Sequence, residues 1–554
     1  MPNATSSPAI ILLGAASLAT AKRLQALYPQ AVIHGLRGRV EGADALYDDF
    51  GATLRALYES NVPIIALCAA GIIIRSLAPV LGAKDAEPPV LAVAEDGSAV
   101  VPLLGGLAGV NNLAREIAAL LAVAPAITTS GELRFGTCVL NPPAGYVLAD
   151  LEHGKRLVSD LLGGQSVRID GAAPWLAEAR LPLDEQASRS IRISPELAAD
   201  SNALLIHPRL VLAQLKQADA DATNLRAALR GAGLAEAALA ALLVDRNQMA
   251  QPHWAAVAAE LNVPLRFIDA SCQLPDAMHS DDSISLHLAA TPEAAQKIGQ
   301  ARGRLSVVGL GPGAADLMVP AVRQALDQAE DVLGYETYVT MAGPFRPEQL
   351  QHNSDNREEL QRAAHAFELA AQGRRVVMVS SGDPGVFAMA AAVLEALEAS
   401  TNSDWHNVEL QMLPGVSAAL ATAAKAGAPL GHDFCMLSLS DNLKPWAMIE
   451  KRLEHAGIAD LAMAFYNPIS KSRPWQLGRA LEIVRQQRRP ETIVVLGRDI
   501  GRPAEALTIT TLGELTPEHV DMRTLVIIGS STTRRFPRAE GGYWVYTPRW
   551  YPAD

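Results

Sequence analysis

The feature that most constrains this chain is a strand-and-turn pattern that recurs six times after residue 304. Each time, a short apolar segment runs directly into a turn rich in Gly, Pro, Asn or Ser. The apolar segments are 305–308, 376–379, 409–413, 462–466, 493–496 and 525–528. In an open α/β sheet, ligands bind beyond the carboxyl ends of the strands, where glycine lets the backbone approach them closely. The pattern therefore predicts a ligand site built from these turns.

Short apolar segments alternate with Ala- and Leu-rich helical segments along the whole chain. In the first part we expect strands at 10–13, 31–34, 64–68, 90–94 and 126–128, and helices at 20–27, 47–60 and 112–122. Farther on we expect helices at 224–243 and 320–329, and strands at 264–268 and 283–288. Strand, helix, strand in that order is typical of parallel sheets covered on both faces. The predicted fold class is α/β, with parallel sheets in both halves.

A polar, basic segment at 296–304, interrupted twice by glycine, predicts the main domain boundary. Before it we expect an α/β domain over 1–135, a proline-containing connector or small subdomain over 136–200, and a weaker α/β domain over 201–295. After it we expect one region over 304–540, which is long enough for two α/β lobes.

Net charge and cysteine content exclude several classes of protein. With 47 basic and 59 acidic residues the net charge is −12, so no nucleic-acid surface is expected. Four cysteines without a CxxC pair argue against a metal site or disulfide framework and favour the cytoplasm. No apolar run reaches the ~20 residues that span a bilayer. The apolar segment 8–21 follows residues without a basic side chain, so we expect a strand and a helix there rather than a signal peptide.

The turn at 309–314 also satisfies the dinucleotide-binding pattern Gly-x-Gly-x-x-Ala, with Glu330 and Asp331 about 20 residues farther on. Pro312 counts against this interpretation, because proline has no N–H to offer a pyrophosphate. A nicotinamide-dependent oxidoreductase stays open as an alternative. So do tight turns that bind no ligand.

Seven motifs follow one another over about residues 304–540. They read GLGPGAADLMVPAVRQALDQAEDVLGYETY, SSGDPGVFAMA, PGVSA, PLGHDFCMLSLSD, FYNPISKSR, VVLGRDIGRP and VIIGSS. Together they resemble the tetrapyrrole (precorrin) methyltransferase family, and within it the precorrin-3B C17-methyltransferases. The resemblance implies two α/β domains with S-adenosylmethionine (SAM) between them, and a cytoplasmic homodimer. It also implies methylation of precorrin-3B at C17, with ring contraction to precorrin-4, in cobalamin biosynthesis. A cobalt-bearing substrate and a carrier of macrocycles without enzymatic activity are the alternatives.

By their positions in these motifs, twelve residues are implied to contact SAM. They are Pro312, Gly382, Asp383, Val386, Phe387, Ser417, Ala418, Tyr466, Asn467, Gly497, Arg498 and Gly529. SAM has no phosphate, so the proline in the first turn is compatible with it. Asp383 has a second possible role as a helix N-cap, because Pro384 would then occupy the first helical position. For Gly529 only backbone contacts are expected, since the family usually has Gly-Asn-Ser where this chain has Gly-Ser-Ser.

The implied substrate carries several carboxylates, so an acidic chain needs a local basic surface to bind it. The implied substrate contacts, in or beside the motif loops, are Lys444, Lys471, Arg473 and Arg502. The catalytic candidates are His432, Ser438 and Asp441. His432 is expected to move a proton during ring contraction, and a structural hydrogen bond is its alternative role. Asp441 is expected to orient the substrate, or else to cap a helix at 445–455.

The first half carries CAAGIIIRSLAP at 68–79, PLLGGLAGVNN at 102–112 and ITT at 127–129. These motifs resemble the cobalt-precorrin-5A hydrolase family. Leu107 stands where that family has histidine, and residues 204–209 lack its Gly-x-Gly-Cys-Arg pattern. Leucine cannot move a proton, so we expect a remnant pocket near Gly71, Arg75 and Asn112 that binds tetrapyrrole without hydrolysing it. The alternative is a bifunctional cobalt-factor III C17-methyltransferase and cobalt-precorrin-5A hydrolase.

Overall fold

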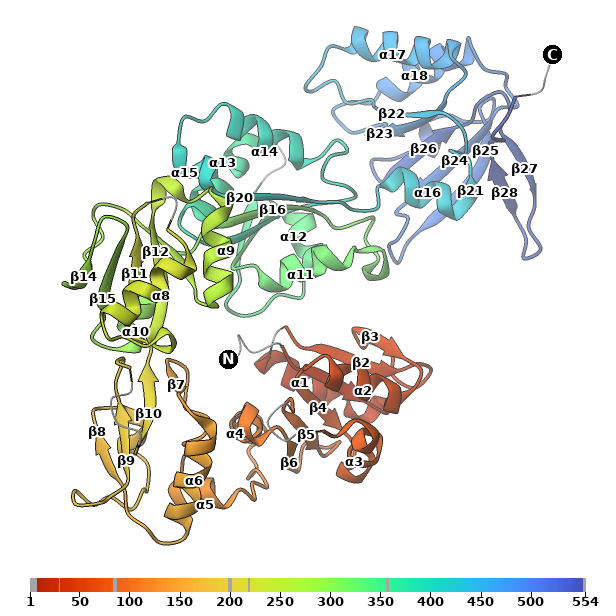
Figure 1. The fold of residues 1–554 in the computed structure, drawn as a ribbon. Helices are drawn as coiled ribbons and strands as arrows, with labels where there is room; N and C mark the ends of the chain where they lie inside the picture. The colour runs from red at the N-terminus through yellow and green to blue at the C-terminus, as the bar shows by residue number, and fades with distance from the viewer. Residues whose placement is uncertain are drawn as a thin grey trace. The chain divides into compact units, whose positions relative to one another are not determined.

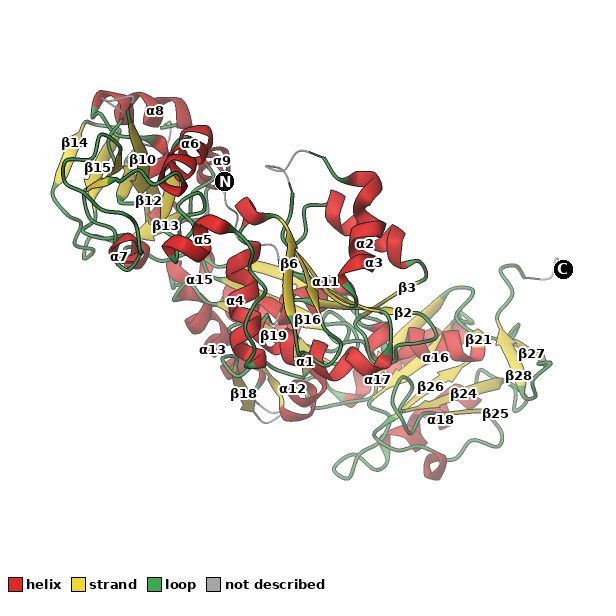
Figure 2. Ribbon diagram, turned by 90° about the horizontal axis from the view of Figure 1, so that it is seen from below, coloured by secondary structure: helices red, strands yellow, loops and turns green. Residues whose placement is uncertain are grey.

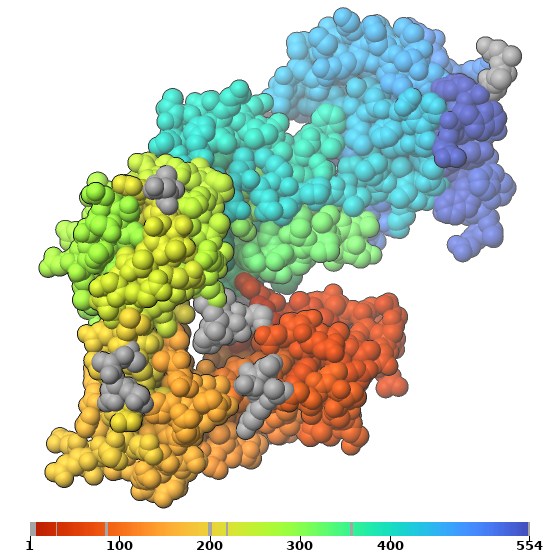
Figure 3. All heavy atoms as spheres, in the orientation of Figure 1, coloured from red at the N-terminus to blue at the C-terminus, as the bar shows by residue number. Residues whose placement is uncertain are grey.

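The computed structural model divides the chain into two compact units, Met1–Arg302 and Gly303–Asp554. It describes residues 7–28, 30–82, 87–197, 202–217, 220–354 and 358–551, which carry the colours of the chain in Figure 3. Helices and strands alternate in both units (Figure 2), which confirms the α/β fold class.

The first unit begins with a six-stranded sheet. Its order is β3 (Ala45–Tyr47), β2 (Val32–Leu36), β1 (Ala9–Leu12), β4 (Ile64–Leu67), β5 (Val90–Val93) and β6 (Val100–Leu104). Neighbouring strands are parallel except β5 and β6. Leu12 packs against α1 (Leu18–Leu27) and α4 (Val110–Leu121), whereas Ile11 packs against α2 (Phe50–Glu59) and α3 (Ala70–Leu77). Side chains of one strand alternate between faces, so helices cover both sides of the sheet.

This sheet differs from the sequence prediction at its edges. Residues 126–128 form no strand, and only an isolated bridge joins Pro125 to Val100. Proline has no N–H, so Pro125 cannot extend a ladder of hydrogen bonds. The short strands β3 and β6 were not predicted, and the helix expected from residue 47 begins at Phe50 because Tyr47 ends β3. The apolar segment 8–21 contains the predicted strand and the start of the predicted helix.

Two smaller sheets complete the first unit. One has the order β7 (Tyr146–Leu148), β10 (Ala203–Pro208), β9 (Ser190–Ile193) and β8 (Arg168–Asp170), and packs with α5 (Ser130–Phe135), α6 (Leu151–Leu162) and α7 (Pro174–Ala177). The other has the order β13 (Leu265–Ile268), β12 (Leu239–Asp245), β11 (Val211–Leu215), β15 (Ile284–Leu288) and β14 (Ala277–Ser280). Its helices are α8 (Ala222–Gly231), α9 (Pro252–Leu261) and α10 (Pro292–Lys297). The strands predicted at 264–268 and 283–288 are confirmed as β13 and β15.

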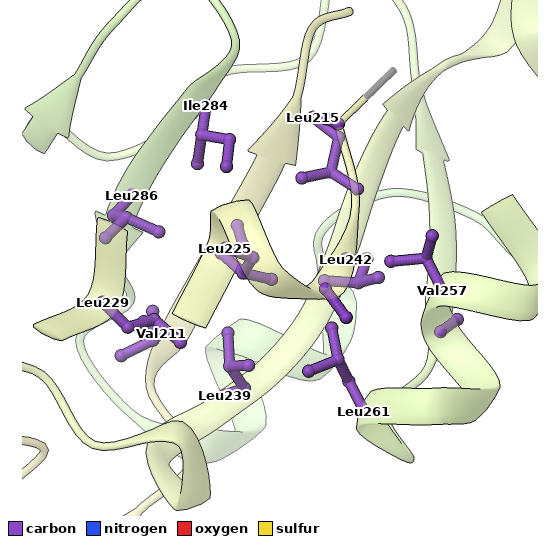
Figure 4. Close-up of a cluster of buried hydrophobic side chains, with 14 of the residues drawn as sticks. Val211, Leu215, Leu225, Leu229, Leu239, Leu242, Val257, Leu261, Ile284 and Leu286 are labelled. Carbon is purple, nitrogen blue, oxygen red and sulfur yellow. The ribbon is translucent and has the colours of Figure 1, made fainter. Parts of the chain in front are cut away.

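The helix predicted over 224–243 is wrong in its second half. Helix α8 ends at Gly231, and Gly233 adopts a φ of 71° in the turn that follows. The next apolar run is the strand β12, in which Leu242 packs into the core shown in Figure 4 and Leu243 packs into another. A strand buried on both faces is a continuous apolar run, which the sequence alone does not distinguish from a buried helix.

The second unit begins with a fully parallel sheet. Its order is β18 (Leu350–Ser354), β17 (Asp331–Tyr335), β19 (Arg375–Ser380), β16 (Arg304–Gly309) and β20 (Glu409–Leu413). Helices α13 (Glu359–Ala371), α14 (Met389–Glu398) and the short α15 (Ser403–Asn407) cover one face, and α11 (Pro320–Gln328) and α12 (Glu336–Ala342) cover the other. Because β16, β19 and β20 are parallel neighbours, the turns that follow them meet at one edge.

The second sheet of this unit is mostly antiparallel. Its order is β22 (Phe434–Ser438), β23 (Ala462–Tyr466), β26 (Thr524–Ile528), β24 (Ile493–Arg498) and β25 (Ala506–Thr511). Strand β26 runs antiparallel to β23 and β24, so it ends at the opposite edge from β22, β23 and β24. This differs from the expected parallel arrangement, because a fully buried apolar strand reads the same in either direction. Helix α16 (Ala418–Ala426) covers one face, and α17 (Trp446–Ile458) and α18 (Gln476–Arg485) cover the other (Figure 1).

A small three-stranded sheet follows, with the order β21 (Gly427–Ala428), β28 (Tyr543–Tyr546) and β27 (Arg534–Pro537). In the part of the chain that the structure describes, every helix is too short or too polar to cross a membrane.

We predict that limited trypsin digestion of the native protein cuts first at Lys297 or Arg302. Lys297 is exposed at the end of α10, and the division between the units falls after Arg302. Few contacts cross a boundary between compact units, so this segment opens more readily than either core. Mass spectrometry should find two resistant fragments that meet there. Early cleavage inside a unit, with the junction intact, would contradict the boundary.

Candidate active site

Three turns meet at the carboxyl edge of the parallel sheet in the second unit. A Cβ on Gly309, at the end of β16, would lie 2.3 Å from the carbonyl oxygen of Gly382 and 2.9 Å from the nitrogen of Gly415. Gly311 and Gly382 also exchange two backbone hydrogen bonds, of 3.1 and 2.8 Å. Only glycine permits this packing of backbone on backbone. The turns form a closely packed floor of buried backbone at this edge of the sheet.

The carboxylate of Asp383 ties two of these turns together. One oxygen accepts the N–H of Gly385 at 2.8 Å, and the other accepts the N–H of Gly415 at 3.0 Å. Helix α14 begins only at Met389, with Ala388 as its N-cap, so the alternative role of Asp383 as a helix cap is wrong. A carboxylate oxygen accepts more than one hydrogen bond. The side chain can therefore brace the floor and still accept a ligand hydroxyl.

An aromatic pair joins this floor to the second sheet. Phe387 follows the β19 turn, and its ring centroid lies 5.3 Å from that of Tyr466 at the end of β23. The Tyr466 hydroxyl accepts the N–H of Ala419 at 3.0 Å, in the first turn of α16. Phe387 is 51% exposed and has a φ of 54°, and the next residue after Tyr466, Asn467, has a φ of 50°. Such strained backbone is uncommon outside glycine and tends to occur at binding sites.

The remaining residues expected near this edge lie between the floor and α16. Ser417 is buried and caps α16, because its hydroxyl accepts the N–H of Leu420. Ala418 is the first residue of that helix, and Val386 donates its N–H to the carbonyl of Asp383 at 3.2 Å. The structure thus brings Val386, Ser417 and Ala418 together with the aromatic pair.

Pro312 also lies at this edge, in contact with the second sheet. Its carbonyl accepts a 3.2 Å hydrogen bond from Nε of Arg502, and its ring packs against Gly501. Beside this contact is an open cleft of about 590 Å³. The cleft is lined by Gly313, Glu336, Thr337, Thr340, Met341, Arg502, Pro503, Ala504 and Arg523.

A buried carboxylate organises the arginines of this region. Asp499 is 5% exposed and contacts Arg523 at 2.7 Å, Arg498 at 3.1 Å and Arg502 at 3.9 Å. Arg498 makes a second ion pair with Asp521 at 2.8 Å. The sequence prediction missed Asp499 and its role, although an acidic residue directly after Arg498 was a signal for it. Arg498 is therefore a member of an ion-pair network, not an isolated cation at the site.

Two of the catalytic candidates lie near the aromatic pair. Ser438 ends β22, and its hydroxyl accepts a 3.1 Å hydrogen bond from the side-chain amide of Asn467. Asp441 accepts two hydrogen bonds, of 3.2 and 3.3 Å, from the amide of Gln476. The expected helix begins at Trp446 without a side-chain cap, so capping by Asp441 is wrong.

His432 and Gly529 lie at the other edge of this sheet. His432 precedes β22 and Ser438 ends it, so about 20 Å separate them at 3.3 Å per residue. The His432 ring packs edge-on against Tyr551 at 5.3 Å, and its Nδ1 accepts the N–H of Asp433. Gly529 follows the antiparallel strand β26 and donates its N–H to Ile493, at the start of β24. The structure does not bring either residue to the other candidates, because a motif does not fix which end of a strand faces the ligand.

Gly497 is a packing residue in β24. A Cβ there would lie 2.3 Å from the hydroxyl of Thr422 in α16, which is itself 1% exposed. This contact leaves no space for a ligand on that face of Gly497. The glycine in the motif therefore allows α16 to pack close to the sheet.

The expected substrate contacts differ in their surroundings. Arg473 is buried and donates to the carbonyl of Asn467 at 3.0 Å, so it positions that turn. Lys471 is exposed. Lys444 is half-buried; burial lowers the pKa of its ammonium, the nearby Arg452 lowers that pKa further, and Asp441 raises it.

In the first unit, helix α4 contacts a buried carboxylate that the sequence prediction missed. Glu132 is 4% exposed and accepts hydrogen bonds from Asn111 at 2.7 Å and Arg115 at 2.6 Å. Its position in the first turn of α5, directly after the Ile-Thr-Thr motif, was a signal for it. Arg75 is exposed and Asn112 accepts from Arg115. Glu132 is thus held by two side chains of α4, the helix that follows the loop carrying Leu107.

Comparison with known proteins gives matches in both units. Residues 304–516 match the family described as Tetrapyrrole (Corrin/Porphyrin) Methylases, and residues 52–132 match the one described as Cobalamin synthesis G N-terminal. The chain is 51% identical over 249 residues to a precorrin-3B C(17)-methyltransferase of Sinorhizobium sp, which covers 45% of this chain and 97% of that protein. The chain belongs to the precorrin-3B C17-methyltransferase family. Both resemblances inferred from the motifs are confirmed.

Two further relatives match the same part of this methyltransferase. The cobalamin biosynthesis protein CobIJ of Mycobacterium bovis is 46% identical over 254 residues, and the match covers 45% of this chain and about half (49%) of that protein. A crystal structure of the methyltransferase CobJ has 53% identity and a TM-score of 0.42, and covers 44% of this chain and 100% of that one. Each of these three matches covers less than half of this chain.

We predict that Asp383→Ala lowers the stability of the methyltransferase unit by about 1.5–3 kcal/mol, because hydrogen bonds to a charged group are lost at two backbone N–H groups. Asp383→Asn keeps one acceptor oxygen and should lose about half as much. The free energy of unfolding, measured by urea denaturation, checks both values. Equal stability of all three proteins would mean that Asp383 does not brace the floor.

Proposed function

We propose that the chain transfers the methyl group of SAM to C17 of precorrin-3B, with contraction of the macrocycle to precorrin-4, in cobalamin biosynthesis. The observation that carries this proposal is the 51% identity over 97% of a precorrin-3B C(17)-methyltransferase. The three turns that meet at the edge of the parallel sheet also support it, because their residues belong to the methyltransferase motifs.

The residues at the floor fit SAM. SAM carries an electrophilic methyl group on a sulfonium sulfur. When the methyl group is transferred, that sulfur remains in the departing product as a neutral thioether. The glycine-lined backbone allows close approach, and Asp383 retains capacity to accept a ribose hydroxyl. The half-exposed face of Phe387 and the ring of Tyr466 suit an adenine or a sulfonium cation. Asn467, which Arg473 positions, offers a further polar group.

The proposed proton-handling groups are Ser438 and Asp441. Ser438 accepts a hydrogen bond from Asn467, and Asp441 follows in the same loop, where it accepts from Gln476. His432 is at the other edge of the sheet and is assigned a structural hydrogen bond instead. Pro312 and Arg502 close the floor against the second sheet. We assign no cofactor contact to Gly529 or Gly497.

The first unit is proposed to be a remnant that binds tetrapyrrole without hydrolysing it. Leu107 replaces the histidine of the resembling family, and Glu132 is already held by Asn111 and Arg115. Glu95, Asp96 and Glu116, the other acidic candidates near this loop, are exposed. A cytoplasmic homodimer that acts on a metal-free macrocycle completes the proposal.

Ligand binding separates the proposed function from its rivals. S-adenosylhomocysteine should bind in calorimetry and NAD should not, and Asp383→Ala should weaken that binding about 10- to 150-fold. Turnover with precorrin-3B, with and without cobalt in the ring, then separates an enzyme from a carrier. Binding of NAD alone would indicate an oxidoreductase, and binding without turnover would indicate a carrier.

Acetaldehyde release tests the first unit. The purified protein given cobalt-precorrin-5A should release no acetaldehyde, because leucine stands where the resembling family has its histidine and, among the described residues, the buried carboxylate of Glu132 is already bonded to Asn111 and Arg115. Deletion of residues 1–295 should leave methyl transfer largely intact. Acetaldehyde formed at a catalytic rate would make the chain a two-reaction enzyme.

A further inference from the structure

An exposed apolar surface lies beyond the ends of β22 and β23. Leu443, in the loop after β22, is 91% exposed, and Trp475, after the β23 loop, is 50% exposed. The Trp475 ring packs edge-on against Trp446, with centroids 4.8 Å apart and planes at 73°. We call Leu443, Trp446 and Trp475 the tryptophan platform. Large apolar groups exposed together indicate a binding surface more often than a solvated one.

Polar contacts hold the platform in place. The indole N–H of Trp446 donates to Glu450 at 2.9 Å, and the same carboxylate oxygen accepts from Arg479 of α18 at 2.7 Å. The two hydrogen bonds from Gln476 to Asp441 tie the loop after β22 to the start of α18. The two tryptophans are therefore fixed before any ligand arrives, which reduces the entropy lost on binding.

Two cations flank the platform. Lys444 directly follows Leu443, and Lys471 lies at the tip of a turn closed by two backbone hydrogen bonds between Ser470 and Arg473. Within the described residues neither ammonium forms an ion pair at contact distance, although Asp441 is close enough to raise the pKa of Lys444. An apolar surface with unpaired cations at its margin is complementary to a flat ring with anionic substituents.

We propose that the tryptophan platform binds one face of the tetrapyrrole macrocycle, with Lys444 and Lys471 paired to carboxylates on its rim. This inference rests on the proposed function and names the surface that holds its substrate. Offset or edge-on contact with aromatic side chains suits a conjugated ring. Ser438 and Asn467 lie at the same edge of the sheet, so a ring on the platform has polar groups beside it.

The hairpin of β27 and β28 offers a matched comparison. Trp544 is 41% exposed, close to the value for Trp475, but the guanidinium of Arg538 covers its ring at 3.8 Å. Arg535 likewise lies over Tyr543, at 4.8 Å. The aromatic faces of this hairpin are occupied by its own arginines, so Trp544 serves as a control for the loss of an exposed tryptophan.

The test measures the dissociation constant of the full chain for uroporphyrin III, a stable polycarboxylate macrocycle, and separately for S-adenosylhomocysteine. Trp475→Ala should weaken macrocycle binding by about tenfold or more, equivalent to about 1.4 kcal/mol, and raise KM rather than lower kcat. Trp475→Phe should restore most of the affinity, and Trp544→Ala should change nothing. The double variant Lys444→Gln with Lys471→Gln should bind the macrocycle more weakly and with less dependence on salt. Binding of S-adenosylhomocysteine should be the same in all variants.

The outcomes distinguish the platform from the proposed function. Unchanged macrocycle affinity in Trp475→Ala, with S-adenosylhomocysteine still bound, would overturn the platform and leave the proposed function intact. A wild-type protein that binds neither ligand would overturn both. Intact macrocycle binding together with a changed sedimentation coefficient in Trp475→Ala would make the surface an interface between copies, and would also overturn the platform.

Discussion

The carboxylate of Asp383 accepts the N–H of Gly415 and so holds the turn after β19 against the turn after β20, while the N–H of Gly385 fixes the carboxylate within its own turn. The backbone of Gly309 packs directly on the backbone of Gly382 and Gly415. This packing depends on the junction, because displacement of either turn would separate these peptide groups. The β20 turn leads directly into the capped start of α16, where Tyr466 accepts a backbone N–H. One continuous set of contacts thus connects the first sheet of the methyltransferase unit to the second.

The direction of β26 decides which motif residues can act together. Because it runs antiparallel to its neighbours, its terminal turn lies with His432 at one edge, while Ser438, Tyr466 and Asn467 lie at the other. Residues that are equally motif-like in sequence therefore divide between the two edges of this sheet. The separation of about six residues along a strand is too long for any side chain to span.

The basic residues of the motif loops in the second unit also fall into two groups, arginines that are bonded within the described part of the protein and lysines that are not. The arginines of the motif loops are engaged: Arg498 and Arg502 with Asp499, and Arg473 with the Asn467 carbonyl. Planar guanidinium groups suit such multiply bonded positions around a buried carboxylate or carbonyl better than ammonium groups do. The lysines of the same loops remain at the margin of an aromatic surface, where a carboxylate-bearing ring would meet them.

The sequence by itself determined the α/β class, the family and the positions of the turns that follow the strands, because strand-to-glycine turns and ordered motifs are local features. It also located Asp383, Phe387 and Tyr466, which the structure brings to one edge. Only the tertiary structure decided the direction of β26, the strand identity of Leu239–Asp245, and the structural roles of His432, Gly497 and Arg473. These features depend on tertiary contacts, such as which strand pairs with a given strand and which side chain packs on a given glycine. Such contacts join residues far apart in the chain, as between Gly497 and Thr422, and leave no trace in local composition.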